Sequence, residues 1–243
     1  MVTQLNQPQP TASDRPEIHY PDSDGQPMAD NTLQFQWIVT IKENLELLFA
    51  NDANVFVAGD LLWYPVEGNN KLRQAPDAMV VFGRPKGYRG SYQQWQEDNL
   101  APQVVFEILS PGNRLKEMAK KFQFYQQYGV EEYYLYDPDT IDLMGWLRGA
   151  ESAESSRQYL TIIEEMEGWV SPRLGIRFAI GAAGLELYDP QGQRFLTFTE
   201  LGQQAQAEKQ RADAEKDRAD AEKDRADRLA AKLQELGIDP TTL

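Results

Sequence analysis

The stretch PQVVFEILSPGN at residues 102–113 decides the fold. Residues 104–109 are apolar apart from Glu107, which predicts a buried sheet strand carrying one carboxylate. The Ser-Pro-Gly-Asn break that follows predicts a turn opening a helix over residues 114–128. Gly129 then stands where a helix end favours a left-handed residue. A strand, turn and helix therefore form the centre of the predicted domain.

The pattern continues outward on both sides of this unit. Upstream, residues 31–50 place apolar side chains at helical spacing, and residues 55–63 and 78–82 are apolar runs typical of strands. Downstream, residues 132–136, 143–147, 158–163, 176–180 and 185–188 predict further short strands. The order of elements predicts an α/β domain with a β-rich end.

Composition restricts the chemistry. The 243 residues include no Cys and one His, His19, and carry a net charge of −14. Thiolate sites, disulfides and His-dependent catalysis are excluded, so any metal is expected to have oxygen ligands, as Mg²⁺ or Mn²⁺ does. The acidity argues against nonspecific coating of nucleic acid. Neither a signal peptide nor a membrane span is expected, and the predicted location is cytoplasmic.

Three regions differ in composition. Residues 1–30 predict a disordered arm, residues 31–198 the folded domain, and residues 199–243 a charged helix in which RADAEKD occurs twice in tandem. A heptad seam is convincing only from Ala226 to Leu236, so a solvated helix and a weak dimerising coiled coil both remain open. A homodimer and a monomer are both compatible with the sequence.

Two carboxylates stand at strand ends. Asp77 precedes one predicted strand and Glu107 lies near the end of another, an arrangement that can hold a divalent ion. The helix that follows offers Lys116, Lys120 and Lys121 to stabilise developing charge. The alternatives are a Pro-Asp turn for Asp77 and a structural ion pair from Glu107 to Arg114 or Lys121.

The loop at residues 83–103 is the most basic and aromatic of the chain. Arg84, Lys86 and Arg89 occur there beside Tyr and Trp side chains. Such a cluster predicts contacts with phosphates and stacking on bases, and an ordinary solvated loop is the alternative.

Four ordered motifs resemble a known family. PDAMVV at residues 76–81, QVVFEILSPGN at 103–113, KFQFY at 121–125 and GVEEYYLYDP at 129–138 are similar to the signatures of the Uma-type putative restriction endonucleases, a branch of the PD-(D/E)XK nuclease superfamily. The resemblance spans residues 35–190. It implies a restriction-endonuclease-like core, with a central mixed β-sheet flanked by helices, and Mg²⁺-dependent cleavage of phosphodiesters.

The resemblance also implies roles for individual residues. Asp77 and Glu107 match the two acidic metal ligands, and Lys121, with Lys120 as the fallback, matches a lysine supplied from the helix. The superfamily's lysine two positions after the second acid is absent, because Leu109 stands there. A further acid is expected from Glu43, Glu46 or Asp60.

Two functions are therefore expected. The first is a DNA endonuclease that hydrolyses phosphodiesters through a metal-activated water, with DNA as substrate. The second is a catalytically inactive nuclease-like fold that oligomerises or acts as a scaffold through its C-terminal helix. The sequence fixes neither the substrate's base sequence nor its strandedness.

Overall fold

The computed structural model describes residues 18–149, 158–181 and 184–235. The elements follow the predicted order, with three short additions, β2, β4 and η2. They are α1 (Thr32–Leu48), β1 (Val55–Ala58), β2 (Trp63–Tyr64), β3 (Ala78–Phe82), β4 (Tyr92–Gln93), the 3-10 helix η2 (Gln94–Gln96), β5 (Val104–Ile108), α2 (Leu115–Tyr128), β6 (Glu132–Asp137), β7 (Asp142–Arg148), β8 (Leu160–Ile162), β9 (Arg177–Gly181), β10 (Gly184–Tyr188) and α3 (Phe198–Glu235).

A six-stranded mixed sheet forms the centre of the domain, in the order β1-β3-β5-β6-β7-β8. Among the described strand pairs of this sheet, only β5 with β6 is parallel, and α2 is the crossover that joins them. The other neighbours within this sheet are antiparallel. The predicted mixed α/β architecture is confirmed.

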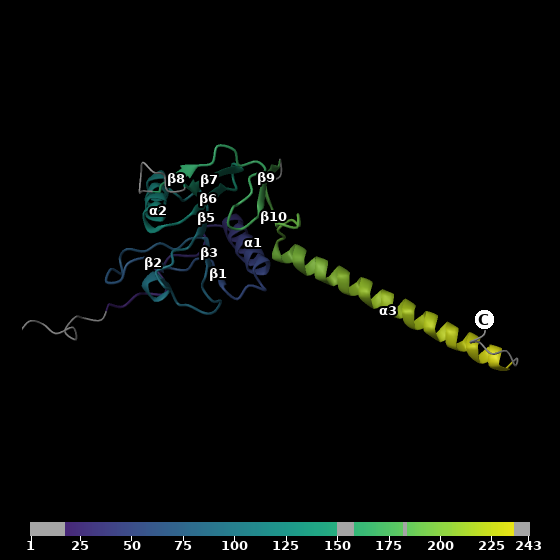
Figure 1. Ribbon diagram of the computed structural model, residues 1–243. Coiled ribbons are helices and arrows are strands. Elements are labelled where there is room, and N and C mark those ends of the chain that lie inside the picture. Colours follow the sequence, from purple (N-terminus) through teal and green to yellow (C-terminus); the bar gives the residue numbers. More distant parts are fainter. Residues whose placement is uncertain (1–17, 150–157, 182–183, 236–243) are drawn as a thin grey trace, which may run out of the picture. The chain divides into compact units, whose positions relative to one another are not determined.

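Both faces of the sheet are covered, with α1 on one and α2 on the other (Figure 1). In β5 the side chains alternate between the faces: Val104 and Phe106 pack with α1, and Val105 packs with α2. The β9–β10 hairpin adds Phe178 and Leu187 to the α1 side. Burial on both faces explains why the central strands are nearly continuous apolar runs.

Capping residues fix the ends of the two helices that flank the sheet. The Asn31 side chain accepts a hydrogen bond from the Gln34 amide and so starts α1. Gly129 ends α2 with a φ of 96°, in the left-handed region, as the sequence predicts. Gln34 Nε2 donates to the Ile108 carbonyl oxygen at 2.8 Å, which ties α1 to the end of β5.

A small parallel pair, β2 with β4, lies outside the main sheet. The segment at residues 18–30, expected to belong to a flexible arm, contacts this pair and its neighbourhood. The Tyr20 ring lies 5.2 Å from that of Tyr64 and 4.9 Å from that of Trp95, measured between centroids. The Tyr64 hydroxyl donates to the Pro21 carbonyl oxygen at 2.7 Å. Residues 1–17 of the predicted arm are outside the described range.

The C-terminal helix α3 belongs to a second unit, residues 196–243, and is described by itself. It begins with a capping box: Thr197 N donates to Glu200 Oε2 at 2.8 Å, and Glu200 N donates to Thr197 Oγ1 at 3.3 Å. Ala226 and Leu229 of the predicted seam are exposed, and Leu236 lies outside the described residues. Within residues 18–149, 158–181 and 184–235, no helix is long and apolar enough to cross a membrane.

Candidate functional site

Two buried carboxylates meet across adjacent strands on the α2 side of the sheet. The register of β3 with β5 pairs Ala78 with Phe106, and one further step places Asp77 opposite Glu107. Both side chains are buried, with exposed fractions of 8% for Asp77 and 2% for Glu107. Like charges directly opposite each other destabilise a sheet, so this pair demands a positive partner.

Asp77 is held by the backbone of the neighbouring strand. Its Oδ2 atom accepts a hydrogen bond from the Ile108 amide at 2.6 Å. Burial, followed by the negative charge of Glu107, raises the pKa of Asp77 well above its ordinary value, although Lys121 and the Ile108 amide act in the opposite direction. Asp77 is therefore a buried, hydrogen-bonded carboxyl group and not only part of a Pro-Asp turn.

Lys121 supplies the positive partner. Its Nζ atom lies 2.7 Å from Glu107 Oε2, and only 15% of its side chain is exposed. Burial alone lowers the pKa of Lys121, but the charges of Glu107 and Asp77 more than offset this and raise it above its ordinary value. The other basic residues considered for this site are exposed, namely Arg114, Lys116 and Lys120. The structure thus brings Lys121, rather than Lys120, to the carboxylates.

Tyr125 completes the surroundings of Glu107 and was not among the site residues predicted from the sequence. Its hydroxyl donates to Glu107 Oε1, and its side chain is fully buried. Burial and the charge of Glu107 raise the pKa of Tyr125 well above its ordinary value, so the hydroxyl keeps its proton. The available signal was its position four residues after Lys121, on the same face of α2.

Tyr133 places a polar atom near the same carboxylates. Among side chains of the described residues, its hydroxyl is the only buried nitrogen or oxygen atom without a hydrogen-bond partner. Burial, followed by the charges of Glu107 and Asp77, raises its pKa. The protein therefore leaves one buried hydroxyl within the electrostatic influence of the two carboxylates unsatisfied.

The other acids considered for the site differ in position. Asp60 N donates to the Pro76 carbonyl oxygen at 3.0 Å, and the pKa of Asp60 is raised by burial and by the charges of Asp24 and Glu107, with Lys121 opposing. Glu43 and Glu46 instead pair with Lys42 and Lys86. In the part of the chain that the structure describes, no three His, Cys, Asp or Glu residues form a metal-binding group.

The donor set fits a small, hard cation. Mg²⁺ is usually bound through one or two carboxylates, with water and substrate phosphates at its other positions. Asp77 and Glu107 provide two carboxylates, and the unpartnered Tyr133 hydroxyl lies within their electrostatic reach. The residues present therefore fit Mg²⁺ or Mn²⁺ better than a soft metal, which requires sulfur or imidazole.

A third buried carboxylate, Glu132, lies on the α1 side and differs from the pair because protein donors satisfy it. It accepts hydrogen bonds from the Tyr134 hydroxyl at 2.8 Å, Ser171 Oγ at 2.5 Å and the Arg173 amide at 2.6 Å. No other acid lies opposite Glu132 in the β6–β7 register, where its partner is Leu147. Glu132 is therefore a satisfied structural carboxylate.

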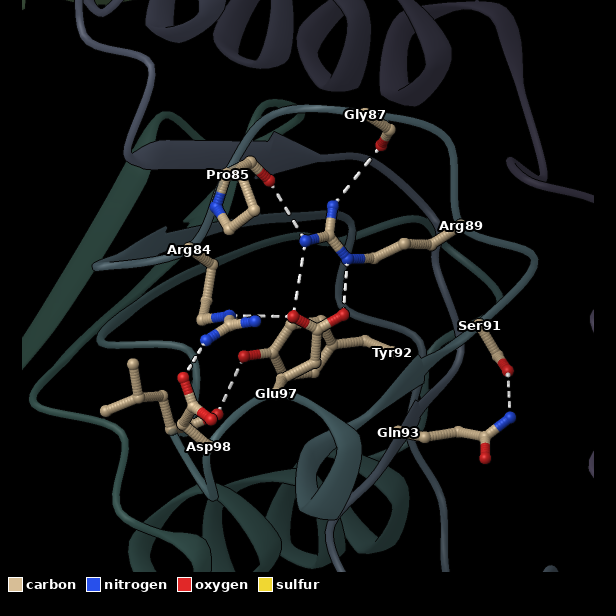
Figure 2. A network of polar contacts seen from close by, with 10 residues as sticks. Arg84, Pro85, Gly87, Arg89, Ser91, Tyr92, Gln93, Glu97 and Asp98 are labelled. Atoms are coloured by element: carbon tan, nitrogen blue, oxygen red, sulfur yellow. Dashed lines mark hydrogen bonds and ion pairs between the residues drawn. The ribbon is translucent and has the colours of Figure 1, made fainter.

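The basic loop forms an internal network of ion pairs (Figure 2). Glu97 lies between Arg84 and Arg89, at 2.8 Å from Arg84 Nε and 2.6 Å from Arg89 Nε, and Arg84 also pairs with Asp98. Lys86 Nζ lies 2.8 Å from Glu46 Oε1. Arg84, Lys86 and Arg89 are thus each paired with a carboxylate, and these ion pairs help to hold the loop.

The fold is that of an α/β protein with a central mixed sheet and helices on both faces. A family model described as "Uma2: Putative restriction endonuclease" matches residues 7–183, and the chain belongs to this family. Among solved structures, the chain is similar to a "putative nuclease belonging to DUF820" from Anabaena variabilis, with 14% identity and a TM-score of 0.42, over 58% of this chain and 72% of that chain. No curated protein matches the chain.

Proposed function

We propose that the protein is a Mg²⁺- or Mn²⁺-dependent DNA endonuclease, with Asp77 and Glu107 as metal ligands and Lys121 as the residue that stabilises charge. The observation that carries this proposal is the placement of Asp77 opposite Glu107, both buried, with Lys121 as their positive partner. A sheet assembled for stability alone avoids two like charges in opposed, buried positions. Membership of the restriction endonuclease family supports nucleic acid as the substrate.

The protein's own groups divide the work. Asp77, fixed by the Ile108 amide, and Glu107, fixed by Tyr125, present carboxylate oxygens from two paired strands. Asp77 and Glu107 would hold Mg²⁺, which when bound would stabilise charge at the phosphate and lower the pKa of an attacking water. The Lys121 ammonium lies within reach of Glu107 and stabilises negative charge that develops on the phosphate oxygens.

The test uses substitutions that remove charge but keep shape. Asp77→Asn and Glu107→Gln proteins, singly and together, are compared with wild type for Mg²⁺ and Mn²⁺ binding by calorimetry and for cleavage of plasmid and single-stranded DNA. Wild type is expected to bind the ion and cut, and the double variant to do neither. Glu43→Gln is the control, because Glu43 is paired with Lys42 and its side chain is about half exposed. Equal cleavage by wild type and the double variant would refute the assignment.

A catalytically inactive, oligomerising protein is the second candidate. The observation that favours it is the closed arrangement of Glu107, whose two oxygens are already engaged by Lys121 and Tyr125. In such a protein the ion pair is purely structural, and Mg²⁺ leaves the thermal stability unchanged. In that case, removal of residues 199–243 would change the oligomeric state, measured by light scattering. If the protein is instead an endonuclease, the shortened protein should still cleave DNA.

A further inference from the structure

We infer that Tyr125 is a positioning residue that restricts Glu107 to binding a cation through one oxygen, and that this restriction makes the site favour Mg²⁺ over Ca²⁺. The inference rests on the proposed metal site and adds its selectivity. The two oxygens of Glu107 have different partners, Tyr125 at Oε1 and Lys121 at Oε2.

Glu107 Oε1 accepts its hydrogen bond from Tyr125, a group that cannot easily move away. The Tyr125 ring is fully buried, stacked on Trp63 at 6.4 Å and 5.1 Å from the ring of Tyr133. The backbone around it is also fixed, because the Val130 amide donates to the Tyr125 carbonyl oxygen at 3.1 Å. A rigid donor in a buried position keeps Oε1 occupied.

Glu107 Oε2 faces a different partner. Lys121 reaches it through a long, flexible side chain that is still 15% exposed. A lysine ammonium can change rotamer more readily than a buried aromatic ring, since its four-carbon chain has many accessible conformations. Oε2 is therefore the oxygen that Glu107 can offer to a divalent ion.

Asp77 repeats this pattern across the strand pair. Its Oδ2 atom is held by the Ile108 amide at 2.6 Å, so a fixed protein donor occupies one oxygen of this carboxylate too. Each acid then contributes one oxygen. Mg²⁺ accepts single carboxylate oxygens in a strict octahedron, whereas Ca²⁺ takes six to eight oxygens, often with both oxygens of one carboxylate.

The test compares ion affinities of the full chain by calorimetry, without DNA. In Tyr125→Phe the hydroxyl is lost and Oε1 is freed, so Mg²⁺ affinity is expected to fall by about 10- to 100-fold, as for other residues that orient a metal ligand. Ca²⁺ affinity is expected to fall much less, because the freed oxygen can serve as an additional ligand. The ratio of the two dissociation constants should therefore shift by about tenfold or more toward Ca²⁺.

The matched control is Tyr134→Phe. Tyr134 also donates from a buried hydroxyl to a buried carboxylate, Glu132, but on the α1 side of the sheet. This variant should lose comparable folding stability and keep both ion affinities. A merely structural effect of Tyr125→Phe would not change the ratio of Mg²⁺ to Ca²⁺ affinity.

The outcomes separate this inference from the proposed function. If wild type binds neither ion, the metal site and this inference both fail. If wild type binds Mg²⁺ and Tyr125→Phe weakens both ions equally or neither, only the role of Tyr125 is overturned. Should Tyr125→Phe not fold, wild type alone decides: tighter binding of Ca²⁺ than of Mg²⁺ contradicts the inference, and tighter binding of Mg²⁺ supports it.

Discussion

Replacing Lys121 by methionine removes the ammonium that pairs with Glu107 Oε2 at 2.7 Å but keeps an unbranched side chain of similar length. The variant leaves a carboxylate that is 2% exposed beside a second buried acid, Asp77. Removing one partner of a buried ion pair costs ~3–5 kcal/mol, and the remaining hydrogen bond from Tyr125 places the expected loss near the lower end. For a domain of this size, such a loss lowers Tm by roughly 6–12 °C.

Mg²⁺ should then act more strongly on the variant than on wild type. In wild type the ion and the Lys121 ammonium are drawn to the same oxygen of Glu107, whereas in Lys121→Met the ion meets no competitor. An ion at a hundred times its dissociation constant stabilises the native state by about 2.7 kcal/mol, which offsets most of the loss. DNA cleavage should nevertheless remain about 10²- to 10³-fold below wild type, because the charge-stabilising group is gone.

The assay is thermal unfolding followed by circular dichroism, with and without Mg²⁺, together with plasmid cleavage. Lys120→Met is the control, since Lys120 is adjacent in sequence but exposed, and its effect on stability should stay within about 0.5 kcal/mol. The reasoning is refuted if both variants lose the same stability, or if Mg²⁺ raises the Tm of Lys121→Met no more than that of wild type.

Three further predictions concern stability, and all are measured by denaturant or thermal unfolding. Tyr133→Phe removes a buried hydroxyl that has no hydrogen-bond partner among the described residues. The free energy of unfolding should therefore stay equal or rise by up to about 1 kcal/mol, and a clear loss of stability would contradict this. Gly129→Ala should cost about 1–2 kcal/mol, because φ is 96° there; an unchanged Tm would show that the α2 terminus adapts. Burial alone raises the pKa of Glu97, but Arg89 and Arg84 lower it below its ordinary value of 4.5. The stability that this ion-pair network contributes should therefore be complete above pH 4.5 and be lost as the pH falls through the lower pKa of the folded state. Glu97→Gln should remove this acid dependence, and a pH profile identical to that of wild type would refute the assignment.

Local signals in the sequence predicted most of the elements. The central apolar strand, the break after it and Gly129 correctly predict β5, α2 and the helix end, because each depends on neighbours within a few residues. The pair β2 with β4 was not predicted, because each of these strands has only two residues, too few for a pattern of alternation.

The site was harder to predict where long-range register decides it. Asp77 and Glu107 were identified as candidates, but their placement opposite each other depends on how the loop at residues 83–103 sets the pairing of β3 with β5. Tyr125 was not predicted as a site residue, since nothing local in the sequence shows that a buried carboxylate lies within reach. The ion pairs of the loop cations were not predicted, because Glu97, Asp98 and Glu46 come close to them only in the folded protein.

The strand order also has a consequence for synthesis of the chain on the ribosome. Asp77, Glu107 and Lys121 are all made before β6, yet α2 rests on a surface that includes Tyr133 and Leu135 of β6. A nascent chain that ends before β6 holds every candidate catalytic residue but has no completed surface on which Lys121 can approach Glu107. Because such domains fold as units, the carboxylate site assembles late in translation, and a truncated product that lacks β6 is expected to be inert toward DNA.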